Sequence, residues 1–144
     1  MEGIAVEITR NEHSTNKFTV EGSSTIPEYD TDMQYCFYIK DSFGVQHGLM
    51  YGVLTKKGDT VKFEVSNSRN QKRGTPEYAH RIVSDAISEL LIRGIVNQWY
   101  SSQARTGVAE HMYRDILSAN EKLRVFPPNE INGNRYLVIA KNQK

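Results

Sequence analysis

Residues 61–100 read VKFEVSNSRNQKRGTPEYAHRIVSDAISELLIRGIVNQWY, and the period of the apolar side chains changes within this stretch. Residues 61–65 alternate apolar and polar side chains, which predicts a half-buried strand. Residues 76–93 have a helical period, with the apolar pairs Tyr78/Ala79, Ile82/Val83, Ala86/Ile87 and Leu90/Leu91. Residues 95–100 are strand-like again. The stretch therefore predicts two strands joined by a crossover helix, which makes the strands parallel neighbours.

A basic loop, residues 69–76, joins the first of these strands to the helix. Arg69, Lys72 and Arg73 supply positive charge, and Gly74 allows a ligand to approach the backbone. The first amides of a helix have no partner within it and carry partial positive charge. The combination is typical of a phosphate site, and it is also typical of a solvated turn that caps a helix.

The helix has matching signals at both ends. Thr75 suits the N-cap, and Pro76 suits the first helical position, where the helix needs no amide donor. Gly94 suits the position that ends the helix. Because proline donates no amide hydrogen bond, Pro76 also removes one donor from an anion site at this loop.

The rest of the chain completes one mixed sheet. Residues 21–32 read as a loop, and residues 108–117 predict a second helix. The other apolar patterns predict strands over residues 4–8, 17–20, 33–39, 47–55, 60–65, 123–126 and 136–140. The predicted fold class is α/β of the mixed α+β kind, with a central, mostly antiparallel sheet and two main packed helices. One domain spans residues 1–144.

Composition limits the classes of function. The chain has 18 Lys and Arg against 17 Asp and Glu, and the net charge of +1 disfavours nucleic acid and membrane surfaces as partners. The single cysteine, Cys36, lies in an apolar run and predicts a buried core residue. The first residues lack a signal-peptide pattern, and no apolar run reaches the roughly 20 residues of a membrane span. We therefore expect a cytoplasmic protein.

The order of elements and the loop together resemble the GNAT superfamily of N-acetyltransferases. In that family a strand leads into a loop of pattern Gln/Arg-x-x-Gly-x-Gly/Ala, followed by a long helix. Residues 71–76, QKRGTP, match the pattern at Gln71 and Gly74, and Pro76 stands where the family has Gly or Ala. The resemblance covers roughly residues 33–141. Compact GNAT-like proteins with degenerate motifs occur among phage and mobile-element proteins.

The resemblance implies a site for acetyl-CoA or CoA. In the family the loop amides hold the pyrophosphate, and the pantetheine arm lies between two strands that diverge. The implied cofactor-binding residues are Val65, Gln71, Lys72, Arg73, Gly74, Thr75, Asn97 and Ser101. Apart from the resemblance, Ser101 and Ser102 suit helix N-capping.

The resemblance also implies two catalytic residues. Residues 109–113, AEHMY, match a family pattern of a small residue followed three positions later by an aliphatic-Tyr pair. The tyrosine often donates a proton to the departing thiolate, so Tyr113 is the implied general acid. Glu64 on the preceding strand is the implied base for the amine. Read alone, Tyr113 predicts a ring packed on the sheet with its hydroxyl in water, and Glu64 predicts a solvent-facing carboxylate.

No metal site is predicted. His47, His80 and His111 are scattered along the chain and lack the spacing of metal ligands. Surface positions, or partly buried positions with hydrogen-bond partners, are the expected places for these histidines.

The implied activity is transfer of an acetyl group to an amine on a small molecule or a protein. GNAT enzymes usually have two helices between their first and second strands that shape the acceptor site, and residues 21–32 are too short and broken to form them. Loops or a second subunit, as in a homodimer, would then bind the acceptor.

Two rival hypotheses stay open. A catalytically inactive GNAT-shaped module that binds a protein partner is favoured by Pro76, the missing helices and the eight tyrosines. A nucleic-acid-binding domain that uses Arg69, Lys72 and Arg73 is disfavoured by the nearly neutral net charge.

Overall fold

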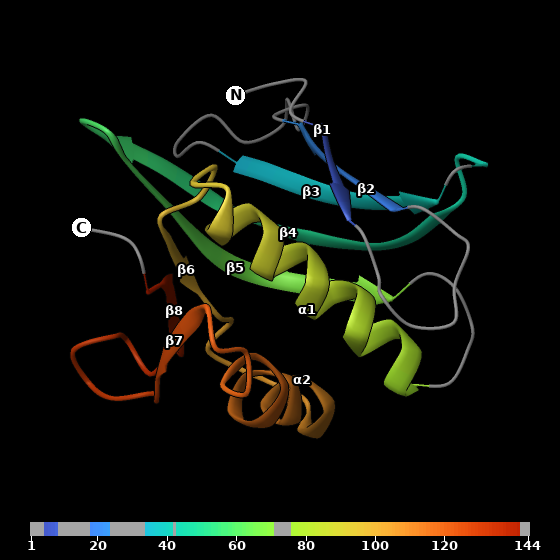
Figure 1. The fold of residues 1–144 in the computed structure, drawn as a ribbon. Helices are drawn as coiled ribbons and strands as arrows, with labels where there is room; N and C mark the ends of the chain where they lie inside the picture. The colour runs from blue at the N-terminus through green and yellow to red at the C-terminus, as the bar shows by residue number, and fades with distance from the viewer. Residues whose placement is uncertain (1–4, 9–17, 24–33, 42, 71–75, 142–144) are drawn as a thin grey trace.

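The computed structural model describes residues 5–8, 18–23, 34–41, 43–70 and 76–141, which form one sheet with helices packed on it (Figure 1). The strands are β1 (Ala5–Ile8), β2 (Phe18–Ser23), β3 (Gln34–Asp41), β4 (Gln46–Lys57), β5 (Thr60–Asn70), β6 (Gln98–Tyr100), β7 (Leu123–Phe126) and β8 (Leu137–Ala140). The helices are α1 (Pro76–Ile92) and α2 (Gly107–His111), and α2 continues as a π-helical segment, η1 (Met112–Leu117).

The sheet has eight strands in the order β1-β2-β3-β4-β5-β6-β8-β7. Strands β1 to β5 form an antiparallel meander, and β8 pairs antiparallel with both β6 and β7. Among the described strands, β5 and β6 form the only parallel pair. The structure thus confirms the expected mixed, mostly antiparallel sheet with two packed helices, and it confirms the expected parallel pair.

Helix α1 makes the crossover from β5 to β6. Its inner side buries Ile82, Ala86 and Leu90 against the sheet, which follows the predicted helical pattern. The helix ends at Ile92, two residues before the predicted stop Gly94, whose φ of +73° is a backbone conformation that favours glycine. The amide of Ile95 then donates to the carbonyl of Leu90 and closes the last turn.

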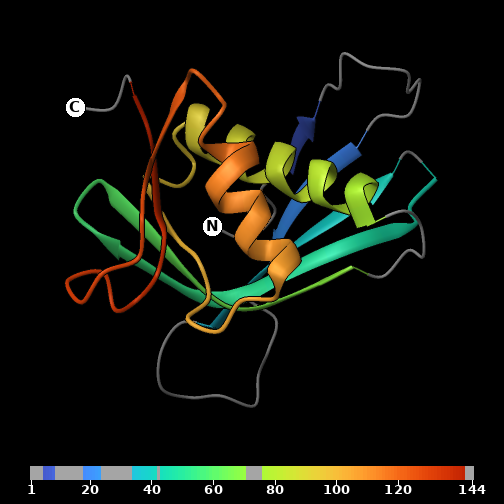
Figure 2. The ribbon, with the colours of Figure 1, turned by 90° about the horizontal axis from the view of Figure 1, so that it is seen from below.

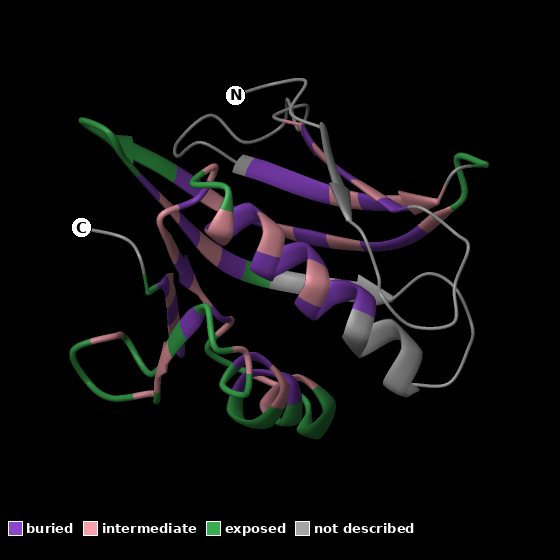
Figure 3. Ribbon diagram, in the orientation of Figure 1, coloured by how far each residue is buried: buried purple, intermediate pink, exposed green. Residues whose placement is uncertain are grey.

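A row of aromatic rings forms the centre of the core. Ring centroids lie 5.1 Å apart for Tyr35 and Phe37, 5.0 Å for Phe37 and Phe63, and 4.8 Å for Phe63 and Trp99. These residues come from β3, β5 and β6, and none is more than 1% exposed. Figure 3 shows the same buried band along the sheet and the inner side of α1. Since a one-residue slip would turn these rings to the opposite face, the row helps to specify the strand register.

The described helices lie on one side of the sheet. Figure 2 shows α1 and α2 together on the same face. On β5, Val61, Phe63 and Val65 are buried on that face, whereas Lys62 and Glu64 are half-exposed. The structure confirms the predicted alternation, and it places Glu64 on the face that the described helices leave uncovered.

Strand β5 carries a bulge near its middle. Val65 pairs with Gly52 of β4, but the next pair along is Asn67 with Tyr51, so Ser66 is an extra residue on β5. A Cβ atom at Gly52 would overlap the backbone carbonyl of Glu64. Glycine at this position therefore allows the two strands to approach at the bulge.

Three strand boundaries differ by three residues or more from those predicted. Strand β2 extends to Ser23, because residues 21–23 pair with β3, so the first part of the expected loop is strand. Strand β5 extends to Asn70, so the basic loop begins later than expected. Strand β6 contains three residues rather than six. Pairing with a neighbouring strand decides where each strand ends, and the side-chain pattern of one strand does not reveal how far that pairing extends.

The second helix also differs from a simple helix over residues 108–117. Its N-cap is Thr106, whose Oγ1 accepts a hydrogen bond from the amide of Ala109 at 3.1 Å. The expected N-cap role of Ser101 and Ser102 is therefore wrong. None of the described helices combines the length and the apolar character needed to cross a membrane.

Candidate functional site

The two parallel strands separate after a short paired segment. Strands β5 and β6 pair only from Lys62 with Gln98 to Glu64 with Tyr100, although β5 continues to Asn70. Ser101, the residue after β6, continues the pairing with β8 instead, and its amide donates to the carbonyl of Tyr136. We call the point of separation the fork and define it by Val65, Ser101 and Arg135.

Arg135 bridges the two sides of the fork. Its Nη1 donates hydrogen bonds to the carbonyl of Val65 at 2.8 Å and to the carbonyl of Ser101 at 2.7 Å. Its side chain is only 17% exposed. Beyond the paired segment no described strand pairs with these carbonyls, so the guanidinium supplies the hydrogen bonds that buried backbone groups require.

Glu64 lies beside Arg135 on the face of the sheet that the described helices leave uncovered, which we call the helix-free face. Its carboxylate is 3.2 Å from the Lys62 ammonium and 4.0 Å from Nε of Arg135. The Lys62 ammonium also lies 5.8 Å from the centre of the Tyr100 ring. Two cations thus share one carboxylate, which leaves this cluster with a local positive charge.

Tyr113 lies on the other face, under the helices. It belongs to η1 and is 4% exposed, and its hydroxyl accepts a hydrogen bond from Nε1 of Trp99 at 2.9 Å. Its ring stacks on Tyr136 with centroids 5.4 Å apart. Burial raises the pKa of Tyr113 well above its usual range, although the Trp99 hydrogen bond acts in the opposite direction. Among the described residues, no acceptor takes the hydroxyl's own proton.

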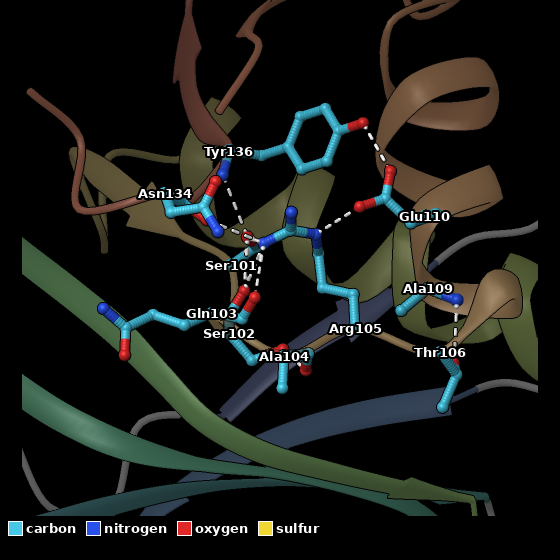
Figure 4. Close-up of polar contacts among 10 residues, drawn as sticks. All are labelled: Ser101, Ser102, Gln103, Ala104, Arg105, Thr106, Ala109, Glu110, Asn134 and Tyr136. Carbon is cyan, nitrogen blue, oxygen red and sulfur yellow. Dashed lines mark hydrogen bonds and ion pairs between the residues drawn. The ribbon is translucent and has the colours of Figure 1, made fainter. Parts of the chain in front are cut away.

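Arg105 holds the loop between the fork and α2 (Figure 4). Its Nη1 donates to the carbonyls of Ser102, Gln103 and Asn134 at 2.7, 3.1 and 2.9 Å. Its Nε donates to Glu110 at 2.6 Å, and the side chain is 8% exposed. One buried cation therefore ties residues 102–103, the start of α2 and the segment before β8 together.

Glu110 and Tyr136 complete this network. The Tyr136 hydroxyl donates to Glu110 at 2.7 Å, and the Arg105 guanidinium lies 5.1 Å from the centre of the Tyr136 ring. The hydrogen bond from Tyr136, and then the one from Arg105, hold the pKa of Glu110 below its usual value. Glu110 is thus a charged anchor that positions Tyr136, the ring on which Tyr113 stacks.

Ser101 and Asn97, both predicted to line the cofactor site, have structural partners. The Ser101 hydroxyl is fully buried, donates to the carbonyl of Ser102 and accepts from the amide of Tyr136. The side chain of Asn97 accepts from the amide of Val61 at 2.7 Å. The amide of Asn97 donates to the carbonyl of Val61 at 2.8 Å. Asn97 therefore fastens β6 to β5 at the end of the paired segment away from the fork.

The structure brings Glu64, Val65 and Ser101 together at the fork, with Tyr113 on the opposite face. Asn97 lies apart from them. The loop residues Gln71, Lys72, Arg73, Gly74 and Thr75 lie outside the described residues, so their role in cofactor binding stays a prediction.

The sequence analysis missed Arg105, Glu110, Arg135 and Tyr136 as members of the site. Arg135 reaches Val65 across 70 positions of the chain, and Arg105 reaches Asn134 across 29 positions. No local motif marks either arginine. The alternation of residues 136–140 was a signal for the last strand, but it did not show what the residue before that strand contacts.

A second polar cluster closes the hairpin between β3 and β4. Asp41 accepts hydrogen bonds from the amides of Phe43 and Val45, and its other carboxylate oxygen lies 2.9 Å from Nε2 of His47. His47 is 5% exposed, which confirms a buried histidine with a partner. Exposed His111 pairs with Asp115 at 2.8 Å. This hairpin cluster therefore has a structural role.

The described part of the chain contains no group of three or more His, Cys, Asp or Glu side chains placed to hold a metal ion. Cys36 is buried as expected, and burial raises the pKa of its thiol. No protein-family model matches the chain, and no curated protein is significantly similar to it.

The fork can be compared with the needs of the implied cofactor. A pantetheine arm carries amide N–H groups, and the carbonyls of Val65 and Ser101 already accept N–H groups from Arg135. The guanidinium thus stands in for an amide donor between the strands. The two carbonyls of the fork are suitable acceptors for the amide groups of such an arm. An arm that bonded to them would displace Arg135.

Proposed function

We propose that the protein is a GNAT-like acyltransferase that binds acetyl-CoA, or a related CoA thioester, and acetylates an amine. The observation that supports this best is the parallel pair of β5 and β6, which separates at Val65 and Ser101 next to the bulge at Ser66. Two diverging parallel strands expose backbone donors and acceptors that an extended amide chain can pair with.

The residues that would hold the cofactor lie on both sides of the fork. The backbone of Val65 and the carbonyl of Ser101 would contact the arm, and the amides of residues 71–75 would contact the pyrophosphate. When bound, the cofactor supplies an activated acyl group and a thiolate leaving group.

The two implied catalytic side chains lie on opposite faces of the sheet. Glu64 is half-exposed on the helix-free face, so an amine that arrives from that side meets a carboxylate oxygen as proton acceptor. Tyr113 lies on the helix face with a hydroxyl proton that no described residue accepts. In such an arrangement Glu64 would take the proton that the attacking amine loses, and Tyr113 would give a proton to the thiolate that leaves.

The acceptor amine would bind over the helix-free face. Figure 2 shows no described helix on this face of the sheet, and the Glu64 side chain is 34% exposed, so an amine on a protein or a small molecule can reach it. A second copy of the chain would be one way to build the missing wall. We place this reaction in the cytoplasm.

A catalytically inactive GNAT-shaped module that binds a protein partner is the second candidate. Two observations favour it: Arg135 occupies the fork, and the Tyr113 hydroxyl is buried against Trp99. In this case the half-exposed tyrosines and apolar residues of the helix-free face would contact a protein partner.

Isothermal titration with acetyl-CoA and CoA tests the first proposal. We expect saturable binding of both, followed by acetylation of members of an amine panel detected by mass spectrometry. Lack of heat and of competition at millimolar ligand would contradict the cofactor assignment. Saturable binding without acetyl transfer, together with a stoichiometric unacetylated protein partner, would support the inactive module instead.

A further inference from the structure

We propose that Arg135 is the gate of the fork. Its guanidinium occupies two carbonyl acceptors that a pantetheine arm between the strands would use, and it turns toward Glu64 when the arm binds. The inference rests on the proposed function, and it concerns how the same site is opened.

The closed position is well defined. Nη1 bonds the carbonyls of Val65 and Ser101 at once, so one nitrogen spans both strands at the point where they separate. The side chain is 17% exposed, so most of its surface is covered while it holds these bonds. No pantetheine amide can bond these carbonyls while Nη1 holds both hydrogen bonds.

The open position has a partner ready. Nε of Arg135 is 4.0 Å from Oε2 of Glu64, which is an ion pair but too long for a hydrogen bond. Nη2 makes no hydrogen bond within the described part of the chain. A turn of the side chain would bring Nε or Nη2 onto Oε2 as a charge-assisted hydrogen bond and leave Oε1 as the proton acceptor of the proposed reaction.

The backbone around Arg135 is held by other residues, so the side chain can rotate without moving it. The carbonyl of Asn134 accepts from Arg105, and the amide of Tyr136 donates to the Ser101 hydroxyl. These bonds fix the residue on each side of Arg135. The movement therefore needs only side-chain rotation, without a shift of β8.

The gate opens only for a ligand that replaces its hydrogen bonds. If Arg135 left the fork alone, two backbone carbonyls would lose their donors, which is costly in a buried place. Amide N–H groups of an arm restore those bonds, whereas an apolar ligand does not. The closed state also lowers the apparent affinity for the arm, because ligand binding must displace it.

The test compares binding of CoA, and of pantetheine as a probe without phosphates, to the full chain by calorimetry. Arg135→Ala should bind both ligands more tightly, by about tenfold if displacing the guanidinium costs roughly one hydrogen bond to a charged group. Arg135→Lys should lie between Arg135→Ala and the unmodified protein. Arg124→Ala, which removes an exposed arginine from β7, should bind like the unmodified protein.

The outcomes distinguish the gate role of Arg135 from the proposed binding of a CoA thioester. Weaker binding by Arg135→Ala would make Arg135 an anchor and overturn the gate. Equal binding by the two proteins would also overturn the gate and leave the proposed function standing. Absence of binding in both proteins would contradict the proposed function, and the gate with it. Binding by Arg135→Ala alone would support both.

A second measurement is made on the unmodified protein. In protein labelled with 15N-arginine, the Nη1 protons of Arg135 should exchange slowly while they bond two carbonyls, and Arg135→Lys identifies their signal. Saturating CoA should abolish this protection. Protection that persists in the CoA complex would overturn the gate, even if the alanine variant failed to fold.

Discussion

At the scale of single residues, Tyr113 changes most between the sequence and the structure. The residue pattern alone predicted a ring on the sheet with its hydroxyl in water. The hydroxyl is instead buried and accepts the indole N–H of Trp99. Because burial raises the pKa of Tyr113, the hydroxyl stays protonated at neutral pH, which a proton donor requires.

Replacing Tyr113 with Phe should therefore have two effects. Trp99 loses the acceptor of a buried N–H group, so the free energy of unfolding should fall by roughly 1–3 kcal/mol in urea titrations. If Tyr113 is the general acid, kcat should fall by about a hundredfold or more. Tyr100→Phe, on the half-exposed face, is the control and should change stability by about 0.5 kcal/mol at most. A Tyr113→Phe protein as stable as Tyr100→Phe would contradict the buried hydrogen bond.

Asp41 should make stability depend on pH in the acid range. The hydrogen bond from His47 lowers the pKa of Asp41 below its ordinary value of 3.8 in the folded protein. The unfolded chain binds this proton more readily, so the charged carboxylate stabilises the fold above about pH 4. That contribution is lost as the pH falls below 3.8 toward the folded-state pKa.

The pH effect is measured by comparing the unmodified protein with Asp41→Asn. The difference in Tm should be largest near pH 7 and should shrink between pH 5 and pH 3. Asp59→Asn, in the exposed turn between β4 and β5, should show no comparable trend. A difference that stays constant over this range would contradict the role of the Asp41 charge.

At the scale of elements, the bulge in β5 is the feature that shapes the fork. It inserts Ser66 beside Val65, whose carbonyl faces Arg135, and it depends on the close approach of β4 at Gly52. The bulge and the separation of the strands thus occur within a few residues of each other. A substitution in β4 should therefore alter the geometry of the fork.

Gly52→Ala tests this packing. A Cβ atom would overlap the carbonyl of Glu64, so we expect a loss of roughly 1–3 kcal/mol in unfolding free energy and weaker binding at the fork. Gly107→Ala is the matched control, because a Cβ atom there meets no atom within 4 Å. It should be neutral or slightly stabilising, since alanine favours the first turn of α2. Equal stability of the two variants would contradict the close approach.

Arg105 should be the main support of the segment between β6 and α2. Arg105→Gln removes a buried cation that bonds three backbone carbonyls and Glu110, so stability should fall by roughly 2–3 kcal/mol. Arg114→Gln removes an arginine whose side chain is 62% exposed and should cost less than about 1 kcal/mol. Urea titration measures both, and a small effect at Arg105 would contradict its role.

The elements were predictable where short-range pattern decides them. The alternation around Phe63 and the helical period that ends at Gly94 were enough for β5, α1 and the parallel pair. Strand ends were not, because pairing partners set them. The contacts of Arg105 and Arg135 were not predictable either, since both join segments far apart in the chain and depend on where the strands separate.

At the scale of the whole molecule, the sheet has two unlike faces. One face buries the aromatic row beneath α1 and α2, and the other presents half-exposed Lys62, Glu64 and Tyr100. The proposed chemistry uses both, because the implied acid lies on the covered face and the implied base lies on the uncovered one. The fork lies between these two faces, at the point where β5 and β6 separate.

The central claim is that the fork receives the arm of a CoA thioester, and a crystal structure of the complex with CoA tests it most directly. The account predicts that the arm lies between β5 and β6, bonds the backbone of Val65 and displaces Arg135 toward Glu64. CoA bound elsewhere on the protein, with Arg135 still bonded to Val65 and Ser101, would contradict the claim.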